Sequence, residues 1–276
     1  MSYADTRSVQ MASPPERIVC LTEESTETLY LLGEQERIVG ISGFTVRPAI
    51  ARKEKPKVSA FLSAKTGKIF DLKPDLVIGF SDLQADIAAE LIRGGLNVMV
   101  FNQRSITEIL DMILMLSAIV GAEAKGRELL QGYTRRIDEL QAVTAEVKNK
   151  PRVYFEEWDD PLISSIRWVS EVVQVAGGVD CFPELSVEGL GKDRIIANND
   201  EVVKRNPDII LGSWCGKKFR PEKVAARDGW DSINAVRHNE LHEIKSVNIL
   251  QPGPAALTDG LEQIHSIIMN WVAEHG

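Results

Sequence analysis

The longest helical pattern of the chain lies near its centre, over residues 122–147. Apolar side chains recur there at steps of three and four residues, namely Leu129, Leu130, Tyr133, Ile137, Leu140 and Val147. Charged residues fill the positions between them and the segment contains no proline, so the pattern predicts one amphipathic helix. At about 1.5 Å per residue, this helix would span roughly 39 Å. A helix of that length can connect two separate lobes.

Two similar stretches lie on either side of this predicted helix. Residues 72–79 read L-K-P-D-L-V-I-G, and residues 205–212 read R-N-P-D-I-I-L-G. Each has the pattern of a helix end, a Pro-Asp turn, a short apolar strand and a glycine where the strand stops. The repetition predicts two lobes of similar build.

Short apolar strands alternate with helical segments in both halves of the chain. In the first half we expect strands over 17–21, 38–42, 75–79 and 97–101, and helices over 26–32, 66–72, 82–92 and 105–120. Ser105 and Glu108 form a capping box for the last of these helices. In the second half we expect a strand over 152–155, a loop over 156–164, helices over 168–176 and 199–205, strands over 208–212 and 242–244, and a final helix over 260–273.

This alternation of continuous apolar strands with helices is typical of parallel sheets that are covered on both faces. We therefore predict an α/β protein with two Rossmann-like lobes joined by one long helix. The predicted boundaries are 16–121 for the first lobe, 122–148 for the connecting helix and 149–276 for the second lobe.

Charge and cysteine content narrow the possible partners and compartments. The net charge is −8 with no long basic run, which argues against nucleic acid or an anionic membrane as partner. The three cysteines form no C-x-x-C motif, so a disulfide framework is not expected. The polar stretch after Met1 contains no signal peptide, and no segment is apolar enough for membrane insertion. We expect a cytoplasmic protein, or a periplasmic one if the sequence is a processed form.

The chain lacks the common catalytic and cofactor motifs. It has no G-x-G-x-x-G fingerprint, no P-loop and no G-x-S-x-G elbow. His238 and His242 are four residues apart, but the sequence around them predicts a loop and a strand rather than a helix, so no metal site is expected. Neither catalytic residues nor an intrinsic cofactor are predicted.

The carboxyl ends of the predicted strands give the candidate binding residues, because ligands of open α/β sheets bind there. These residues are Glu23, Glu24, Phe44, Phe61, Phe80, Glu157, Trp158, Trp214, Lys217, Lys218 and Arg220. Aromatic side chains with a few charges suit a large, partly flat organic ligand. For each residue a structural alternative exists: the phenylalanines as lobe core, the basic residues as a solvated loop, and the glutamate pair as a favourable charge at a helix N-terminus.

Four stretches resemble the helical-backbone class (class III) of ABC-transporter substrate-binding proteins. They are R-I-V-C-L-T-E-E-S-T-E-T-L-Y-L-L-G at 17–33, R-I-V-G-I-S at 37–42, L-K-P-D-L-V-I-G at 72–79 and W-V-S-E-V-V-Q-V-A-G-G at 168–178. Proteins of this class bind cobalamin, ferric siderophores or haem between two α/β lobes. The resemblance implies a non-enzymatic binding protein for such a chelate, with a corrinoid preferred.

The resemblance also implies roles for individual residues. Phe44, Phe61 and Phe80 fall where cobalamin-binding members place aromatic pocket residues, and Arg194 or Arg220 would serve a siderophore. Members of this class carry a secretion signal and dock with an ABC permease through an acidic residue on each lobe. Here Gly67 occupies that position in the first lobe, which argues against docking there, whereas the second lobe has Asp200 and Glu201.

Two other functions remain open at the level of sequence. One is a cytoplasmic sensor or carrier of such a chelate, which would need an apolar partner-binding patch away from the ligand. The other is an enzyme that reuses the same cleft. An enzyme would show a carboxylate with a strongly shifted pKa in the cleft, with Glu23, Glu24, Glu156 and Glu157 as the first candidates.

Overall fold

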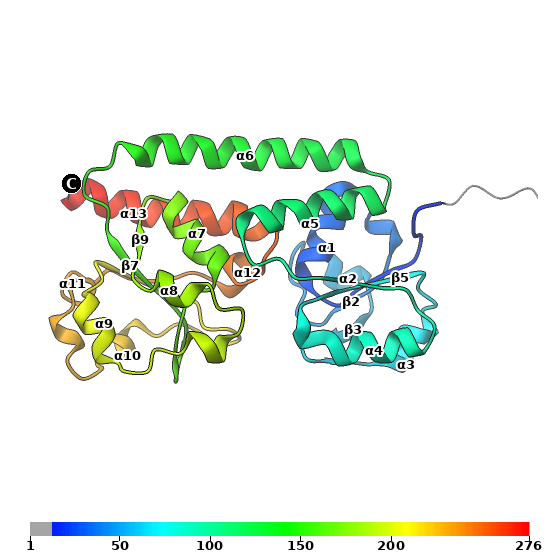
Figure 1. The fold of residues 1–276 in the computed structure, drawn as a ribbon, viewed down its shortest axis with the longest axis horizontal. Coiled ribbons are helices and arrows are strands. Elements are labelled where there is room, and N and C mark those ends of the chain that lie inside the picture. The colour runs from blue at the N-terminus through cyan, green and yellow to red at the C-terminus, as the bar shows by residue number, and fades with distance from the viewer. Residues whose placement is uncertain (1–12, 276) are drawn as a thin grey trace, which may run out of the picture.

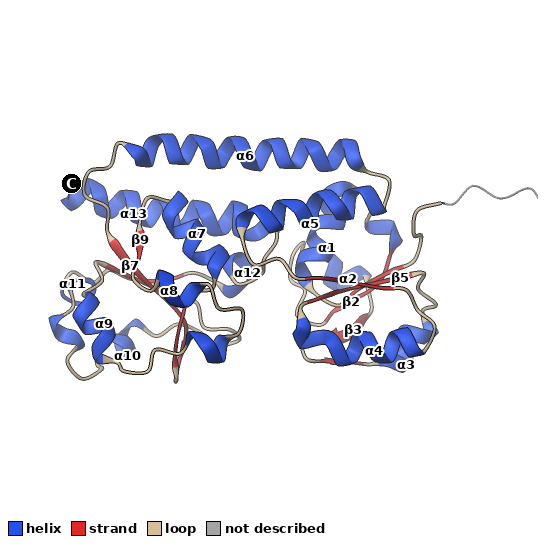
Figure 2. Cartoon of the chain, in the orientation of Figure 1, coloured by secondary structure: helices blue, strands red, loops and turns tan. Residues whose placement is uncertain are grey.

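The computed structural model describes residues 13–275, which form two α/β lobes connected by one long helix (Figure 1). The N-lobe is built on a six-stranded sheet and the C-lobe on a five-stranded sheet. Helices lie on both sides of the strands in each lobe (Figure 2). The connecting helix α6 (Glu123–Ala145) runs alongside both lobes and, at 23 residues, is about 35 Å long. The predicted fold class and the central helix are confirmed.

The N-lobe sheet has the strand order β4-β3-β2-β1-β5-β6. Its strands are β1 (Ile18–Cys20), β2 (Ile38–Ser42), β3 (Lys57–Ala60), β4 (Ser63–Ala64), β5 (Leu76–Phe80) and β6 (Val98–Phe101). All pairs are parallel except β3 with β4. Every residue of the central strands β1 and β5 is buried, which explains why they are continuous apolar runs.

The N-lobe helices are α1 (Glu23–Leu32), α2 (Ala51–Glu54), α3 (Thr66–Asp71), α4 (Ala85–Arg93) and α5 (Ile106–Ile119). The predicted capping box of α5 is confirmed, because Ser105 Oγ accepts from the backbone N–H of Glu108 and the Glu108 carboxylate accepts from the N–H of Ser105. Helix α1 begins at Glu23, three residues before the predicted start at Thr26. Both Glu23 and Glu24 therefore lie in its first turn, where the helix dipole favours negative charge.

The C-lobe sheet has the order β11-β10-β7-β8, with β9 paired to β7. Its strands are β7 (Arg152–Asp159), β8 (Leu162–Ser164), β9 (Val179–Asp180), β10 (Ile209–Gly212) and β11 (Leu241–Glu243). Its helices are α7 (Arg167–Val175), α8 (Pro183–Ser186), α9 (Asp200–Arg205), α10 (Pro221–Ala225), α11 (Asn234–Arg237), α12 (Ser246–Ile249) and α13 (Leu261–His275), with a π-helical turn, η5 (Ala256–Gly260), before α13.

The loop predicted over 156–164 is wrong. Strand β7 continues through Asp159 and turns back into the antiparallel strand β8, with Glu156 opposite Ser164 and Trp158 opposite Ile163. The run of acidic residues hid this hairpin in the sequence. Its first carboxylate, Glu156, is fully buried because Arg227, far away in sequence, pairs with it.

The two Pro-Asp turns close the two lobes in the same way. In the N-lobe, Asp75 accepts from the backbone N–H of Arg17, and the Arg17 guanidinium donates to the carbonyl of Leu72. In the C-lobe, Asp208 accepts from the backbone N–H of Arg152, and the Arg152 guanidinium donates to the carbonyl of Arg205. The aspartate thereby ties β5 to β1 and β10 to β7, so the internal repeat has a structural basis.

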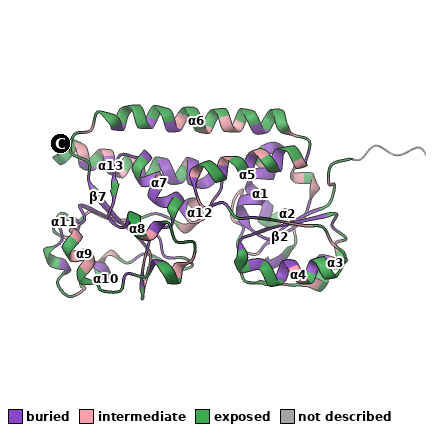
Figure 3. Ribbon diagram, in the orientation of Figure 1, coloured by how far each residue is buried: buried purple, intermediate pink, exposed green. Residues whose placement is uncertain are grey.

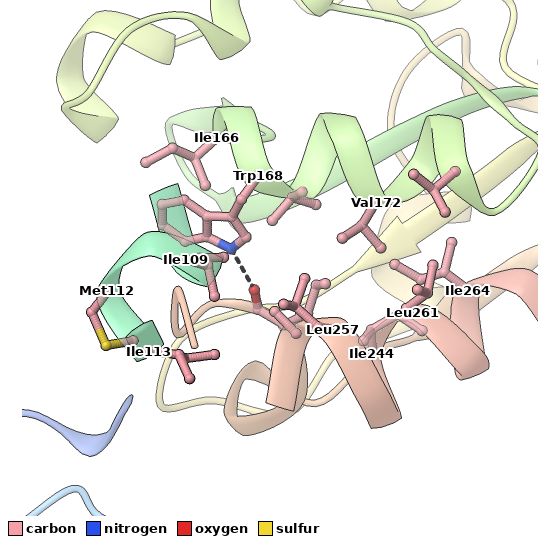
Figure 4. Packing of buried hydrophobic residues seen from close by; sticks show 14 of the residues in the cluster. Ile109, Met112, Ile113, Ile166, Trp168, Val172, Ile244, Leu257, Leu261 and Ile264 are labelled. Carbon is pink, nitrogen blue, oxygen red and sulfur yellow. Dashed lines mark hydrogen bonds between the residues drawn. The ribbon is translucent and has the colours of Figure 1, made fainter. Parts of the chain in front are cut away.

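One hydrophobic cluster runs through both lobes. Figure 4 shows Ile109, Met112 and Ile113 of α5 packed near Trp168 of α7. The Trp168 indole N–H donates to the carbonyl of Ile249 at 2.8 Å. Figure 3 shows that buried residues gather where α5, α7 and α13 meet, whereas α6 above them is largely exposed. Because the lobes share this core, we expect them to move little relative to one another.

Candidate ligand-binding site

The N-lobe presents its predicted aromatic residues at the carboxyl ends of its strands. Phe44 follows β2 and is 56% exposed, while Phe61 follows β3 and is half-buried. The buried Gln84 side chain joins two of these strand ends, since it donates to the carbonyl of Phe61 and accepts from the N–H of Phe80. Phe80 ends β5 and is only 5% exposed, so its predicted place as an open pocket residue is corrected, whereas Phe61 lies in the turn after β3. We call the strand-end residues of the two lobes the rims.

Apolar side chains other than the predicted aromatics are also exposed, on two strand-end loops of the N-lobe and on a C-lobe loop that follows a helix. In the N-lobe, Leu62 follows β3 and Leu83 follows β5, with exposed fractions of 67% and 44%. In the C-lobe, Val187 lies in the loop after α8 and is 67% exposed. Exposed apolar side chains that gather in one region mark a binding surface more often than singly scattered ones do.

The two rims face each other. The backbone segment of Gly189 in the C-lobe lies beside the Arg104 guanidinium of the N-lobe. Burial raises the pKa of Cys215, which follows β10, and the carboxylates of Glu157 and Glu23 raise it further. Because Glu23 belongs to the N-lobe and Glu157 to the C-lobe, Cys215 lies within the field of both. The Gln103 side chain of the N-lobe also donates to the carbonyl of Pro252 in the C-lobe at 2.8 Å, so the two lobes meet directly.

Glu23 and Glu24 are buried rather than open to a ligand. Burial raises the pKa of Glu24 to about 8, with Glu23 as a further cause, and Glu24 accepts a hydrogen bond from Thr22 Oγ1 at 2.6 Å. Burial also raises the pKa of Glu23. A Cβ added to Gly253 of the C-lobe would lie 2.5 Å from the Glu24 Cβ. Glu24 is thus part of the contact between the lobes, which corrects its predicted position on an open rim.

Arg194 is held inside the C-lobe instead of pointing to a ligand. It is 2% exposed, and its two terminal nitrogens donate to the Glu157 carboxylate at 2.6 and 3.0 Å. It also donates to the carbonyl of Ser164. Such a bidentate pair fixes both side chains. Arg194 therefore positions Glu157, and a siderophore role for Arg194 is not supported.

Trp214 also differs from its predicted position. Its side chain is 4% exposed and packs against Phe219 with ring centroids 5.1 Å apart. Its indole N–H donates to the buried Glu156 at 3.0 Å, and Glu156 in turn accepts from Tyr154 and from Arg227. This network stabilises Trp214 within the C-lobe core, where a ligand has no direct access to it.

Trp158 lies at the margin of the same core and is only half-buried. Its indole N–H donates to the carbonyl of Asp160 at 2.9 Å, which fixes the ring on the β7–β8 hairpin. Arg220 is exposed and lies beside Glu222, at 3.6 Å. It lines a cavity of about 270 Å³ with Lys218 and Glu243, and all residues of this cavity belong to the C-lobe.

Arg104 is a rim residue that the sequence reasoning missed. Its guanidinium lies over the Phe80 ring at 4.8 Å, and its closest carboxylate oxygen, on Asp82, is 3.6 Å away. Burial lowers the pKa of Arg104, as does the nearby Arg194. Among the described residues, no hydrogen bond is donated by this guanidinium. The sequence contains a signal for it, because Arg104 follows the strand predicted over 97–101 and ligands bind at the carboxyl ends of such strands.

The described residues offer neither a cluster of metal ligands nor a membrane-spanning helix. Within residues 13–275, no three or more His, Cys, Asp and Glu side chains gather as a metal site would require. His242 pairs with Glu240 at 2.7 Å, and the His238 ring lies beside that of His275. In the same range, no helix has the length and apolar character needed to cross a membrane.

Comparison with known proteins places this chain in a family of binding proteins. The sequence profile of the periplasmic binding protein family matches residues 18–247. The uncharacterized ABC transporter substrate-binding lipoprotein YvrC of Bacillus subtilis is 26% identical over 95% of this chain and 82% of its own length. A vitamin B12-binding protein of Vibrio vulnificus is 28% identical, with 92% of this chain and 90% of its own length covered.

A solved structure shows the same fold. The periplasmic heme-binding protein BhuT, in complex with two hemes, superimposes with a TM-score of 0.78 at 19% identity, covering 95% of this chain and all of its own. The expectation of a cytoplasmic protein finds no support among these relatives, since one is named a lipoprotein and another periplasmic. A cytoplasmic sensor is likewise unsupported.

Proposed function

The chain belongs to the periplasmic binding protein family, whose members are non-enzymatic solute-binding proteins, and from this premise we propose that it binds a bulky metal chelate between its two rims for an ABC permease. The observation that carries the proposal is the direct approach of the two lobes at Arg104 and Gly189, together with the exposed Phe44, Leu62 and Leu83 on the N-lobe rim. A ligand large enough to contact Phe44 and Trp158 together would cover this surface.

A corrinoid is the chelate that we favour. The relative from Vibrio vulnificus is named as a vitamin B12-binding protein and matches nearly the whole chain. Phe44, Phe61 and Trp158 offer faces and edges of aromatic rings, which suit van der Waals contact with a large ring system. Arg104 adds free hydrogen-bond donors at the edge of this surface for polar groups on the ligand periphery.

An enzymatic use of the same surface is not favoured. Glu24 has the raised pKa expected of a catalytic carboxylate, but burial in the contact between the lobes is the main cause. The Glu24 side chain is 4% exposed and already hydrogen-bonded to Thr22, so a substrate does not reach it. The carboxylates of Glu156 and Glu157 are likewise engaged by arginines.

We propose that the C-lobe carries the surface that docks with a permease. Asp200 and Glu201 begin α9, which precedes β10, and α3 precedes β5 in the same way in the N-lobe. There Gly67 is exposed, and a Cβ added to it would meet nothing within 4 Å. We expect a double change of Asp200 and Glu201 to alanine to weaken stimulation of the permease ATPase. The change Gly67→Glu, which the open surface accommodates, should strengthen it.

The ligand is tested by calorimetric titration of the purified protein with cobalamin, haem and a ferric siderophore. We expect one chelate to bind at a single site, with cobalamin the tightest and a dissociation constant below about 10 μM. The variant Phe44→Ala should weaken binding, whereas Ile92→Ala, an equally exposed apolar residue on α4, serves as the matched control. The proposal fails if none of the three chelates binds below about 100 μM and a small metabolite is turned over instead.

A further inference from the structure

The side chain of Lys217 covers two indole rings of the C-lobe. Its ammonium lies 4.3 Å from the ring centroid of Trp158 and 5.1 Å from that of Trp214. The same ammonium forms an ion pair with Asp159 at the end of β7. Trp158 and Trp214 are the two tryptophans that the sequence predicted as ligand contacts. In the structure, the protein's own lysine lies over both.

Local backbone geometry brings Lys217 to this place. The chain turns after Trp214, with Gly216 at a φ of +76°, and the backbone N–H of Lys217 donates to the carbonyl of Trp214 at 3.3 Å. A left-handed residue such as Gly216 lets the turn close tightly. The turn directs the Lys217 side chain across the neighbouring β7–β8 hairpin, which carries Trp158 and Asp159.

The interactions that hold Lys217 are weak. Its side chain is 41% exposed, and water screens both a cation–π contact and an ion pair at such a site. Together the two contacts correspond to a factor of about three to thirty in the equilibrium between the covered and uncovered states. A ligand that gains more than this by stacking on the half-buried Trp158 ring displaces the lysine.

We propose that Lys217 is a displaceable cover, which occupies in the free protein the aromatic surface on which a flat ligand ring stacks. The inference rests on the proposed function and deepens it, because it assigns a residue that sets how much stacking a ligand needs. A broad ring system gains enough contact area to displace Lys217, whereas a small metabolite does not. Displacing Lys217 costs each stacking ligand the same factor, so only a ligand with a large, flat ring stays tightly bound.

The cover can be tested without any ligand. Of the five tryptophans, Trp168, Trp214, Trp230 and Trp271 are at most 6% exposed, so collisional quenching by acrylamide reports mainly on the half-buried Trp158. We expect Lys217→Ala to raise the Stern–Volmer constant clearly and Lys218→Ala, the adjacent exposed lysine, to leave it unchanged. An unchanged constant in a folded Lys217→Ala variant would overturn the cover, whether or not a ligand is known.

The effect on binding is tested with the chelate that binds in the titration above. We expect Lys217→Ala to bind it about three- to thirty-fold more tightly, and Lys217→Arg, which keeps a cation over the rings, to bind like the unchanged protein. In a Trp158→Ala background, the gain should be much smaller. Weaker binding by Lys217→Ala would show instead that the lysine contacts the ligand. If no chelate binds any variant, the proposed function fails while the quenching result still decides the cover.

Discussion

The buried carboxylate of Glu156 gives the sharpest prediction about what holds the C-lobe rim in place. Glu156 is fully buried and accepts from Arg227 at 2.6 and 2.9 Å, from the Trp214 indole at 3.0 Å and from the Tyr154 hydroxyl at 3.1 Å. The substitution Glu156→Gln keeps the shape and one acceptor oxygen, but it removes the charge. Arg227, with 16% of its side chain exposed, is then left without the carboxylate that pairs with it.

The size of the effect follows from this geometry. Removing one partner of a buried ion pair costs about 3–5 kcal/mol, because the remaining charge stays desolvated. We expect a loss near the lower end, about 3 kcal/mol, since the glutamine oxygen still accepts from one of the three donor residues. That is a large part of the 5–15 kcal/mol or so by which a typical domain is stable.

Urea unfolding followed by far-UV circular dichroism measures the change. The double variant Glu156→Gln with Arg227→Met should be more stable than the single Glu156→Gln variant, because no unpaired charge is left inside the lobe. Glu139→Gln, at an exposed pair with Arg136, is the control and should cost no more than about 1 kcal/mol. A loss below about 1 kcal/mol for Glu156→Gln, or a double variant less stable than the single one, would refute the reasoning.

Three further predictions concern the contact between the lobes and the ligand. Burial raises the pKa of Glu24 from 4.5 to about 8, so its protonated form is favoured in the folded state. The free energy of unfolding should therefore fall as the pH rises through this range. In urea titrations at several pH values, Glu24→Gln should remove most of that fall. Gly253→Ala places a Cβ 2.5 Å from that of Glu24 and should cost about 1–3 kcal/mol and weaken chelate binding in calorimetry; unchanged values for both would contradict the close contact between the lobes. Arg104→Ala should weaken binding of haem roughly tenfold but leave its uncharged dimethyl ester unaffected, and equal effects on both ligands would show that Arg104 does not bind an anionic group.

Patterns local in sequence predicted most of the fold. The 3.6-residue periodicity of the central segment, the capping box at Ser105 and the repeated Pro-Asp turns each depend on neighbours within a few residues, and the structure has all three. The turns repeat because Asp75 and Asp208 each tie the start of one central strand to the next. Because both lobes need this tie between strands, the same Pro-Asp pair occurs in both halves of the chain.

The parts that sequence did not predict depend on contacts between distant residues. The β7–β8 hairpin looks like an acidic loop until Arg227 neutralises Glu156, and nothing near residue 156 indicates that partner. Trp214 was expected on the surface for the same reason, since its burial depends on Phe219 and Glu156. Arg194 was expected to be free, but Glu157 binds it. In each case a tertiary contact, rather than local pattern, determines which side chains remain for a ligand.

The central claim, that a ligand lies between the two rims, is tested most directly by the reactivity of Cys215. This thiol is exposed just after the carboxyl end of β10, whereas Cys20 and Cys181 are buried. The rate at which iodoacetamide alkylates Cys215, measured by mass spectrometry with and without saturating chelate, reports whether the ligand covers this point. We predict that bound chelate slows alkylation at least about tenfold, because a thiol that is covered about 90% of the time reacts about ten times more slowly. An unchanged rate in the presence of bound chelate would place the ligand elsewhere and contradict the account.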